Sequence, residues 1–153
     1  METTLNAPKV ISSKEGKKMN VLGHEATIKL HSSDANNNYV FEVISPAGSG
    51  IPPHVHQDED EVIYVMSGEY EVLIGDDVFT AGSGSWLNFV RHIPHGFKNT
   101  GTTAGKTLWF VSPGDKFEEF FDKLGSLPPG PPDLQKVAQL FSDYGMTILP
   151  PKE

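Results

Sequence analysis

Between residues 20 and 111 the chain is divided into short segments with the two-residue alternation, or the β-branched and aromatic content, of strands. Turns separate them, because 15 glycines and 12 prolines are spread along the sequence without a period. No segment in this stretch carries the apolar repeat of a helix. The predicted strands are 24–31, 39–45, 61–67, 70–74, 78–81, 85–90, 95–99 and 106–112, with a loop at 45–53. This spacing predicts an all-β fold, an antiparallel sandwich or barrel.

After Ser112 the pattern becomes that of helices. Ser112 and Pro113 are suited to a helix start, and a proline-rich linker at 127–132 separates two amphipathic segments. The first ends at Gly125, and the second is capped by Asp133 and stops at Gly145. The apolar face of the first consists of Phe117, Phe120, Phe121 and Leu124, at positions i, i+3, i+4 and i+7.

These patterns divide the chain into three parts. We expect a polar N-terminal arm at 1–19, a β-barrel at 20–112 and a C-terminal helical extension at 113–153. The two short helices are expected to pack on the outside of the barrel.

Composition excludes several classes of protein. Without cysteine the chain has no disulfide, thiolate zinc site or cysteine nucleophile. A net charge of −8, with Arg91 as the only arginine, argues against nucleic-acid binding. The longest apolar run, residues 62–66, is far too short to span a membrane, and the first 18 residues lack the apolar core of a signal peptide. We therefore expect a cytoplasmic protein that binds neither nucleic acid nor membranes.

Four histidines fall within residues 54–95, and three of them form a pattern typical of metal binding. His54 and His56 are two residues apart, so an extended backbone points both side chains to the same face. Glu61 at the start of the next strand and His95 on a later strand can reach that face. Three imidazoles and one carboxylate suit one divalent transition metal: iron, manganese, nickel, cobalt, copper or zinc.

Other residues compete for these roles. His92 is an alternative to His95 as the fourth ligand, and Glu59 replaces Glu61 if the strand register slips by one pair. Otherwise Glu59 and its acidic neighbours are expected in a loop that faces solvent. His24 and His31 are expected at exposed strand ends.

The spacing of these residues with certain glycines resembles the cupin family. Gly48-x5-His54-x-His56-x4-Glu61-x6-Gly68 matches the first cupin motif throughout, and Gly82 follows. His95-x3-Asn99 matches the end of the second motif. The second motif departs from the family pattern at two positions, where Val90 stands for a proline and His92 for a glycine. The resemblance covers roughly residues 38–112 and is to small single-domain cupins.

The resemblance implies a jelly-roll β-barrel that holds one metal through His54, His56, Glu61 and His95, with one or two coordination positions open. Glu61 is then also the candidate catalytic base. The segment Pro113 to Phe121 further resembles the quercetin 2,3-dioxygenase-like branch. That likeness implies dioxygen insertion into an enol-type or flavonol-like aromatic substrate. Small cupins are commonly homodimers, by sheet packing and exchange of terminal segments.

Two other functions stay open, since one fold hosts many chemistries. One is a metal-dependent isomerase or lyase acting on a small oxygenated metabolite, and the other is a non-enzymatic module that binds a small ligand. No flavin, nicotinamide or P-loop motif is present. Six aromatic residues are candidates for an apolar substrate pocket, with plain barrel core as the alternative: Tyr39, Phe41, Tyr70, Phe89, Phe97 and Trp109.

Overall fold

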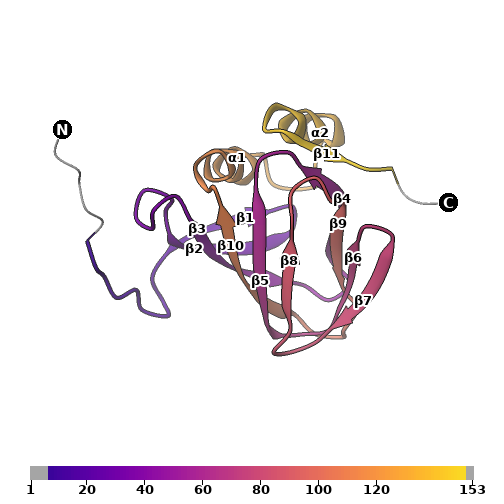
Figure 1. The fold of residues 1–153 in the computed structure, drawn as a ribbon, viewed down its shortest axis with the longest axis horizontal. Helices are drawn as coiled ribbons and strands as arrows, with labels where there is room; N and C mark the ends of the chain where they lie inside the picture. Colours follow the sequence, from indigo (N-terminus) through magenta and orange to yellow (C-terminus); the bar gives the residue numbers. More distant parts are fainter. Residues whose placement is uncertain (1–6, 151–153) are drawn as a thin grey trace.

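Two antiparallel sheets face each other in the computed structural model, which describes residues 7–150 (Figure 1). The six-stranded sheet has the order β1-β2-β3-β10-β5-β8, and the five-stranded sheet has the order β11-β4-β9-β6-β7. The first comprises β1 (Lys17–Val21), β2 (His24–Leu30), β3 (Tyr39–Ser45), β10 (Gly105–Ser112), β5 (Asp60–Ser67) and β8 (Trp86–Phe89). The second comprises β11 (Met146–Ile148), β4 (Gly50–His56), β9 (His95–Asn99), β6 (Tyr70–Ile74) and β7 (Asp77–Ala81). The predicted all-β jelly-roll fold with two short helices is confirmed.

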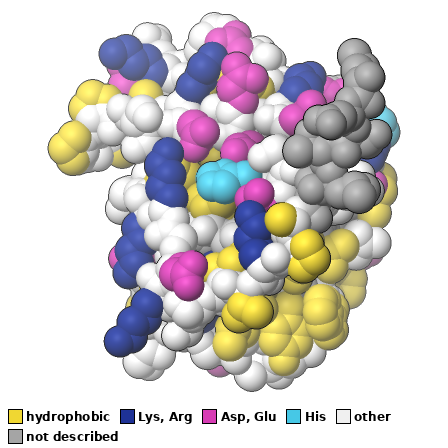
Figure 2. Space-filling model, turned by 90° about the vertical axis from the view of Figure 1, so that its left-hand side faces the viewer, with side chains coloured by type: hydrophobic (Ala, Val, Ile, Leu, Met, Phe, Trp, Pro, Cys, Tyr) yellow, Lys and Arg dark blue, Asp and Glu magenta, His cyan; other side chains and the backbone are white. Residues whose placement is uncertain are grey.

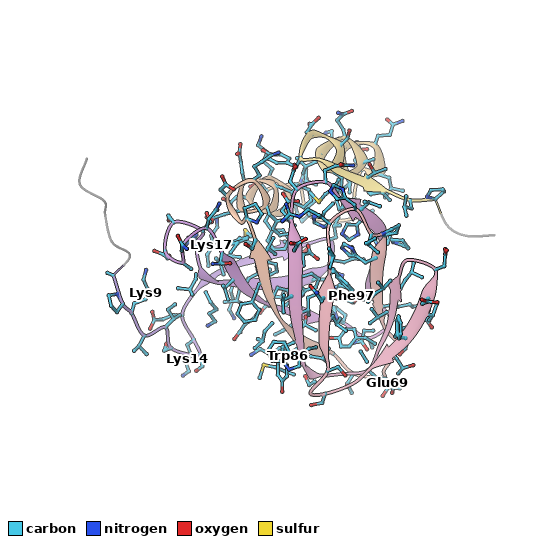
Figure 3. All side chains as sticks on the ribbon, viewed as in Figure 1. Lys9, Lys14, Lys17, Glu69, Trp86 and Phe97 are labelled. Atoms are coloured by element: carbon cyan, nitrogen blue, oxygen red, sulfur yellow. The ribbon has the colours of Figure 1, made fainter. Side chains whose placement is uncertain are left out.

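Alternating side chains fill the space between the sheets (Figure 3). Along β3, Tyr39, Phe41 and Val43 are buried, while the residues between them are more exposed. The same alternation buries Ile63 and Val65 on β5. Because strand side chains point to opposite faces in turn, one face of each strand contributes to a single core.

Three strands differ from the sequence-based expectation. β1 begins at Lys17, inside the stretch predicted as a polar arm, and it pairs with β2. β4 begins at Gly50, so the predicted loop ends earlier than Pro53. β11, near the C-terminus, pairs with β4 opposite the two histidines. Residues 1–6 of the predicted arm and 151–153 of the predicted extension lie outside the described residues.

Both predicted helices are present, at one end of the barrel (Figure 1). They are α1 (Asp115–Gly125) and α2 (Leu134–Asp143). Asp133 caps α2 as predicted, accepting hydrogen bonds from the amides of residues 135 and 136, whereas α1 has Gly114 rather than Ser112 at its N-cap. Within residues 7–150, neither helix is long and apolar enough to cross a membrane. The apolar face of α1 is buried against the barrel, so this helix closes that end of the core.

The outer face of the six-stranded sheet exposes large apolar side chains. Trp86 on β8 is 64% exposed, and its ring contacts Tyr64 on β5. Val62 and Phe110 are directly paired across β5 and β10 and are also exposed. Figure 2 shows hydrophobic side chains gathered over one part of the surface. A contiguous apolar surface of this kind is a common feature of association sites.

Candidate metal centre

Four side chains from three strands converge inside the barrel. His54 and His56 lie on β4, Glu61 on β5 and His95 on β9. β4 and β9 are hydrogen-bonded neighbours that pair His54 with His95, whereas Glu61 comes from the opposite sheet. All four side chains are buried, and one potential ligand atom of each lies within 4.8 Å of the others. The residues named from their spacing therefore form one cluster.

The distances within this cluster fit a first-row metal ion. The Nε2 atoms of His54 and His56 are 3.1 Å apart, and Nε2 of His56 is 3.2 Å from Oε1 of Glu61. Oε2 of Glu61 is 3.6 Å from Nε2 of His95. Ligand atoms bound at about 2.0–2.1 Å from one metal ion are separated by roughly 3–3.4 Å when they are neighbours. The cluster is thus close to the size of a coordination sphere.

The outer nitrogen of each imidazole is held by an acceptor. Nδ1 of His54 donates to the carbonyl oxygen of Pro52 at 2.9 Å, and Nδ1 of His95 donates to that of Ile93 at 3.0 Å. Each of these two rings therefore directs its Nε2 atom inward, and Nε2 of His95 is buried without a hydrogen-bond partner. Such outer hydrogen bonds orient the histidine ligands of metal sites. An inward-facing, unpartnered nitrogen is what a metal ligand requires.

The charges of the cluster favour a cation at its centre. Burial lowers the pKa of His54 to about 4, so this ring is neutral. Burial also opposes the charged forms of His56 and Glu61, but the attraction between these two groups prevails. The pKa of His56 rises to about 10, and the pKa of Glu61 falls well below its usual range. Without a metal, a proton on His56 supplies the positive charge, and a divalent cation would take its place.

The sequence predicted that Glu59 faces solvent, but the structure buries its side chain. Its side chain is 1% exposed, and Oε2 accepts a hydrogen bond from Nδ1 of His56 at 3.0 Å. Oε1 is buried with no hydrogen-bond partner. The prediction was wrong because the turn between β4 and β5 is tight and folds Glu59 back under His56. Glu59 therefore supports the third imidazole from outside, while Glu61 lies at the centre.

The remaining histidines have different environments. His92 is exposed and lies outside the cluster, with its backbone amide bonded to the carbonyl oxygen of His56. It has φ of 69°, a left-handed conformation suited to the glycine that cupins usually have there. His31 is exposed, as expected. His24 is only 2% exposed, so the expectation of a surface position was wrong: Ser45 and the carbonyl oxygen of Gly50 bind its ring inside the barrel.

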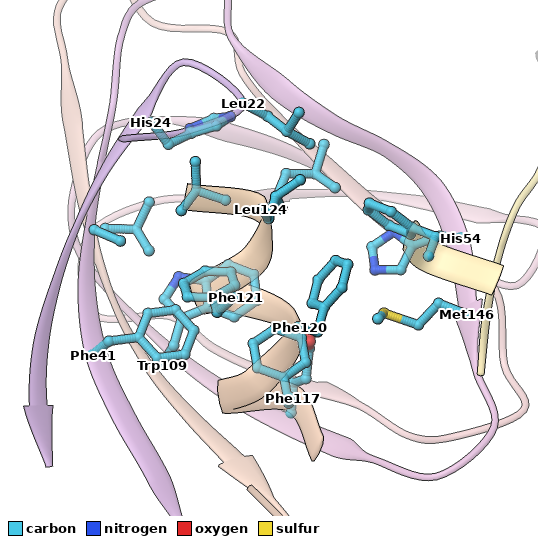
Figure 4. A pocket seen from close by; sticks show the side chains of 16 residues that line it. Leu22, His24, Phe41, His54, Trp109, Phe117, Phe120, Phe121, Leu124 and Met146 are labelled. Atoms are coloured by element: carbon cyan, nitrogen blue, oxygen red, sulfur yellow. The ribbon is translucent and has the colours of Figure 1, made fainter. Parts of the chain in front are cut away.

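A narrow apolar cavity adjoins the cluster (Figure 4). His54 and Glu61 lie in its wall, and its volume is about 40 Å³, enough for about three water molecules. Of the aromatic residues named from the sequence, Phe41 and Trp109 line it, whereas Tyr39, Tyr70, Phe89 and Phe97 belong to the surrounding core. The helices contribute five lining residues, and the sequence indicated those of α1 only as its apolar face: Phe117, Phe120, Phe121, Leu124 and Phe141.

Comparisons with known proteins agree with the fold. Residues 40–111 match the family model described as Cupin domain. The crystal structure of a predicted oxalate decarboxylase from Thermotoga maritima has a TM-score of 0.61 and 22% identity, covering 67% of this chain and 97% of that chain. The polyketide cyclase RemF from Streptomyces resistomycificus has a TM-score of 0.59 and 18% identity, and the match covers 69% of this chain and 79% of that chain. Residues 40–111 thus form a cupin domain, as the motif spacing predicted.

One curated relative is also similar in sequence. Protein SchB from Streptomyces halstedii is 25% identical over 79 residues, which are 52% of this chain and 57% of SchB. The match thus spans little more than half the length of that relative.

Proposed function

We propose that this cupin is a metal-dependent oxidoreductase of the dioxygenase type that acts on an aromatic substrate with an enol or phenol oxygen. The observation that carries the proposal is the position of the cluster. Three imidazoles and Glu61 converge, and two of these residues, His54 and Glu61, lie in the wall of a cavity that is otherwise mostly apolar and aromatic. A ligand set of this kind suits iron, manganese, nickel, cobalt, copper or zinc.

When bound, such a metal would polarise an oxygen substituent of the substrate and, if redox-active, activate dioxygen beside it. The protein supplies the rest of the chemistry. Glu61 is ionised, and its carboxylate faces the cavity, so it is the base that we propose takes the enol or phenol proton. Phe41 and Trp109 lie on the side of the cavity opposite His54, where their apolar rings would exclude water from the oxygenated end of the substrate (Figure 4).

The fold alone does not select this reaction. The two solved structures named above are described as proteins of different activity, a predicted oxalate decarboxylase and a polyketide cyclase. An isomerase or lyase acting on a small oxygenated metabolite would use the same ligands without dioxygen. The small volume of the cavity favours this second candidate if the helices do not move.

The test is dioxygen uptake with quercetin as the substrate probe. Protein reconstituted with iron, manganese, nickel, cobalt, copper or zinc is incubated with quercetin in air and under argon. The proposal expects uptake with at least one redox-active metal and its loss in Glu61→Ala. Equal turnover under argon would indicate an isomerase or lyase, and binding of quercetin without turnover would indicate a binding module. Either result would overturn the dioxygenase assignment.

We also propose a homodimer. The exposed apolar side chains on the outer face of the six-stranded sheet, Val62, Trp86 and Phe110 among them, support sheet-to-sheet packing of two copies. Light scattering after size-exclusion chromatography should give a dimer mass for the native chain and a monomer mass for Trp86→Glu. A monomer mass for both would contradict the proposal.

A further inference from the structure

The cavity beside the ligand cluster is too small to hold an aromatic substrate alone. Pockets that bind small organic molecules usually have volumes of several hundred Å³, against about 40 Å³ here. At the end near His24 the cavity is bounded by Leu22, in the turn between β1 and β2, and by Leu124 near the end of α1 (Figure 4). A substrate that reaches the cluster must therefore extend beyond these two side chains.

A much larger groove lies on the other side of the same two leucines. Its volume is about 750 Å³, and it runs between the β1–β2 turn and the proline-rich linker that joins α1 to α2. Leu22 and Leu124 line both the groove and the inner cavity, so they form the wall between them. The apolar part of the groove is completed by Leu127 and the linker prolines.

Leu22 has a backbone conformation that leucine rarely adopts. Its φ is 51°, and that of the following Gly23 is 87°, as in the tight two-residue turns where asparagine and glycine are favoured. A bulky residue in the left-handed region costs stability, and such residues concentrate at functional sites. The side chain of Leu22 is half-buried at the boundary of the two spaces. The turn thus holds an unfavourable residue at the point where the inner cavity meets the groove.

We propose that this groove is the outer part of the substrate site, and that Leu22 and Leu124 form the gate through which the substrate reaches the ligand cluster. The proposal rests on the function proposed above. The ligand is an elongated aromatic molecule with its oxygenated end at the cluster and an apolar body in the groove. The proline rings present flat apolar surfaces to that body, and Lys136 and Asp133 at the rim can bind polar substituents.

A second entrance is the alternative. A groove of about 340 Å³ on the five-stranded sheet shares one lining residue, Ile51, with the inner cavity. The proline-linker groove is favoured because it is larger and shares two residues with the cavity. The following measurement distinguishes the two.

Access to the cavity can be measured without turnover, because Trp109 lines it and is buried. Trp86, the only other tryptophan, is exposed and is removed by Trp86→Phe. In this background, quenching of Trp109 fluorescence by acrylamide reports how readily a small neutral molecule enters the metal-free protein. Leu22→Gly should raise the quenching constant severalfold, and Leu22→Phe should lower it. Asn36→Gly is the matched control, because Asn36 also has positive φ, 52°, and lies outside the groove.

The outcomes are distinct. Equal quenching in Leu22→Gly and Asn36→Gly, with no decrease in Leu22→Phe, would overturn the gate. An increase in Ile51→Ala alone would assign the entrance to the other sheet. Because acrylamide access needs neither metal nor dioxygen, the gate can be supported even if the dioxygenase assignment fails.

Binding of the substrate body is tested in the same background with quercetin as the quencher. Leu127→Asp should weaken quercetin binding by about tenfold, since it places a charge against the apolar body. Leu134→Asp is the matched control, because Leu134 is 74% exposed and does not line the groove. Equal affinities of these two variants would contradict the role of the groove in binding.

Discussion

The two sides of the inner cavity are built on different physical principles. On one side the ligand cluster is held by directed hydrogen bonds, and its outer nitrogens each contact a specific acceptor. On the other side the aromatic residues of α1 pack against Phe41 and against one another, with ring centroids about 5 Å apart. The first side depends on individual atoms and the second on filled volume, so the two should respond differently to substitution.

The largest expected effect separates His95 from His92. His95→Ala should remove a metal ligand and abolish stoichiometric metal binding, because only three ligand residues remain around a charged centre. His92→Ala should retain the metal, because His92 is exposed outside the cluster. Metal analysis of both proteins, after dialysis against the same metal solution, checks this. Retention of a full equivalent by His95→Ala would contradict the ligand set.

On the apolar side, Phe120→Ala should destabilise the fold without removing the metal. Phe120 is 2% exposed and contacts Phe117, Phe141 and Tyr144, so its loss leaves a cavity that costs about 3–5 kcal/mol. The matched control is Phe79→Ala on β7, which is 51% exposed and lies outside the proposed dimer face, and it is expected to cost less than about 1 kcal/mol. Urea denaturation gives both values. A parallel loss of metal from folded Phe120→Ala would show that the two sides are not independent.

Glu59→Gln should weaken metal binding while leaving all four ligands in place. The neutral amide is a poorer acceptor for Nδ1 of His56 than the carboxylate, and its NH2 group would be buried without an acceptor. Loss of such an outer partner typically lowers metal affinity by about 10–100-fold. Asp58→Asn is the control, since Asp58 is bound to Lys116 at the surface. Competition with a chelator measures both affinities, and equal values would contradict the role of Glu59.

The smallest expected effect is a gain of stability at the turn beside the cluster. His92→Gly should stabilise the protein, because glycine adopts positive φ without strain. The gain should be about 1 kcal/mol or less, because glycine also loses more backbone entropy on folding. Thermal unfolding should then shift upward by about 2–4 °C. Asn36→Gly should change less, because asparagine already tolerates this conformation. A lower melting temperature for His92→Gly would contradict the strain inferred at this residue.

The cluster and the barrel were predictable from the sequence to a large extent. His54, His56 and Glu61 are close in the chain, and strand periodicity alone directs the two histidines to one face. The choice of His95 as the fourth ligand required the cupin motif spacing, because its place in the sequence alone did not distinguish it from His92. Glu59 and His24 were placed on the surface, since a buried polar side chain cannot be recognised until its hydrogen-bond partners are known.

By itself, the sequence determined most of the strand pattern, the two helices and three residues of the cluster, because these depend on local periodicity and short spacings. Only the tertiary structure decided what surrounds the cluster. The sequence predicts the apolar face of α1 from its helical periodicity. It does not predict which surface the phenylalanines cover, because the hydrophobic effect is not directional. The phenylalanines of α1 pack at the end of the barrel, beside Leu22 and the proline linker. This packing depends on contacts between residues about 100 positions apart in the chain.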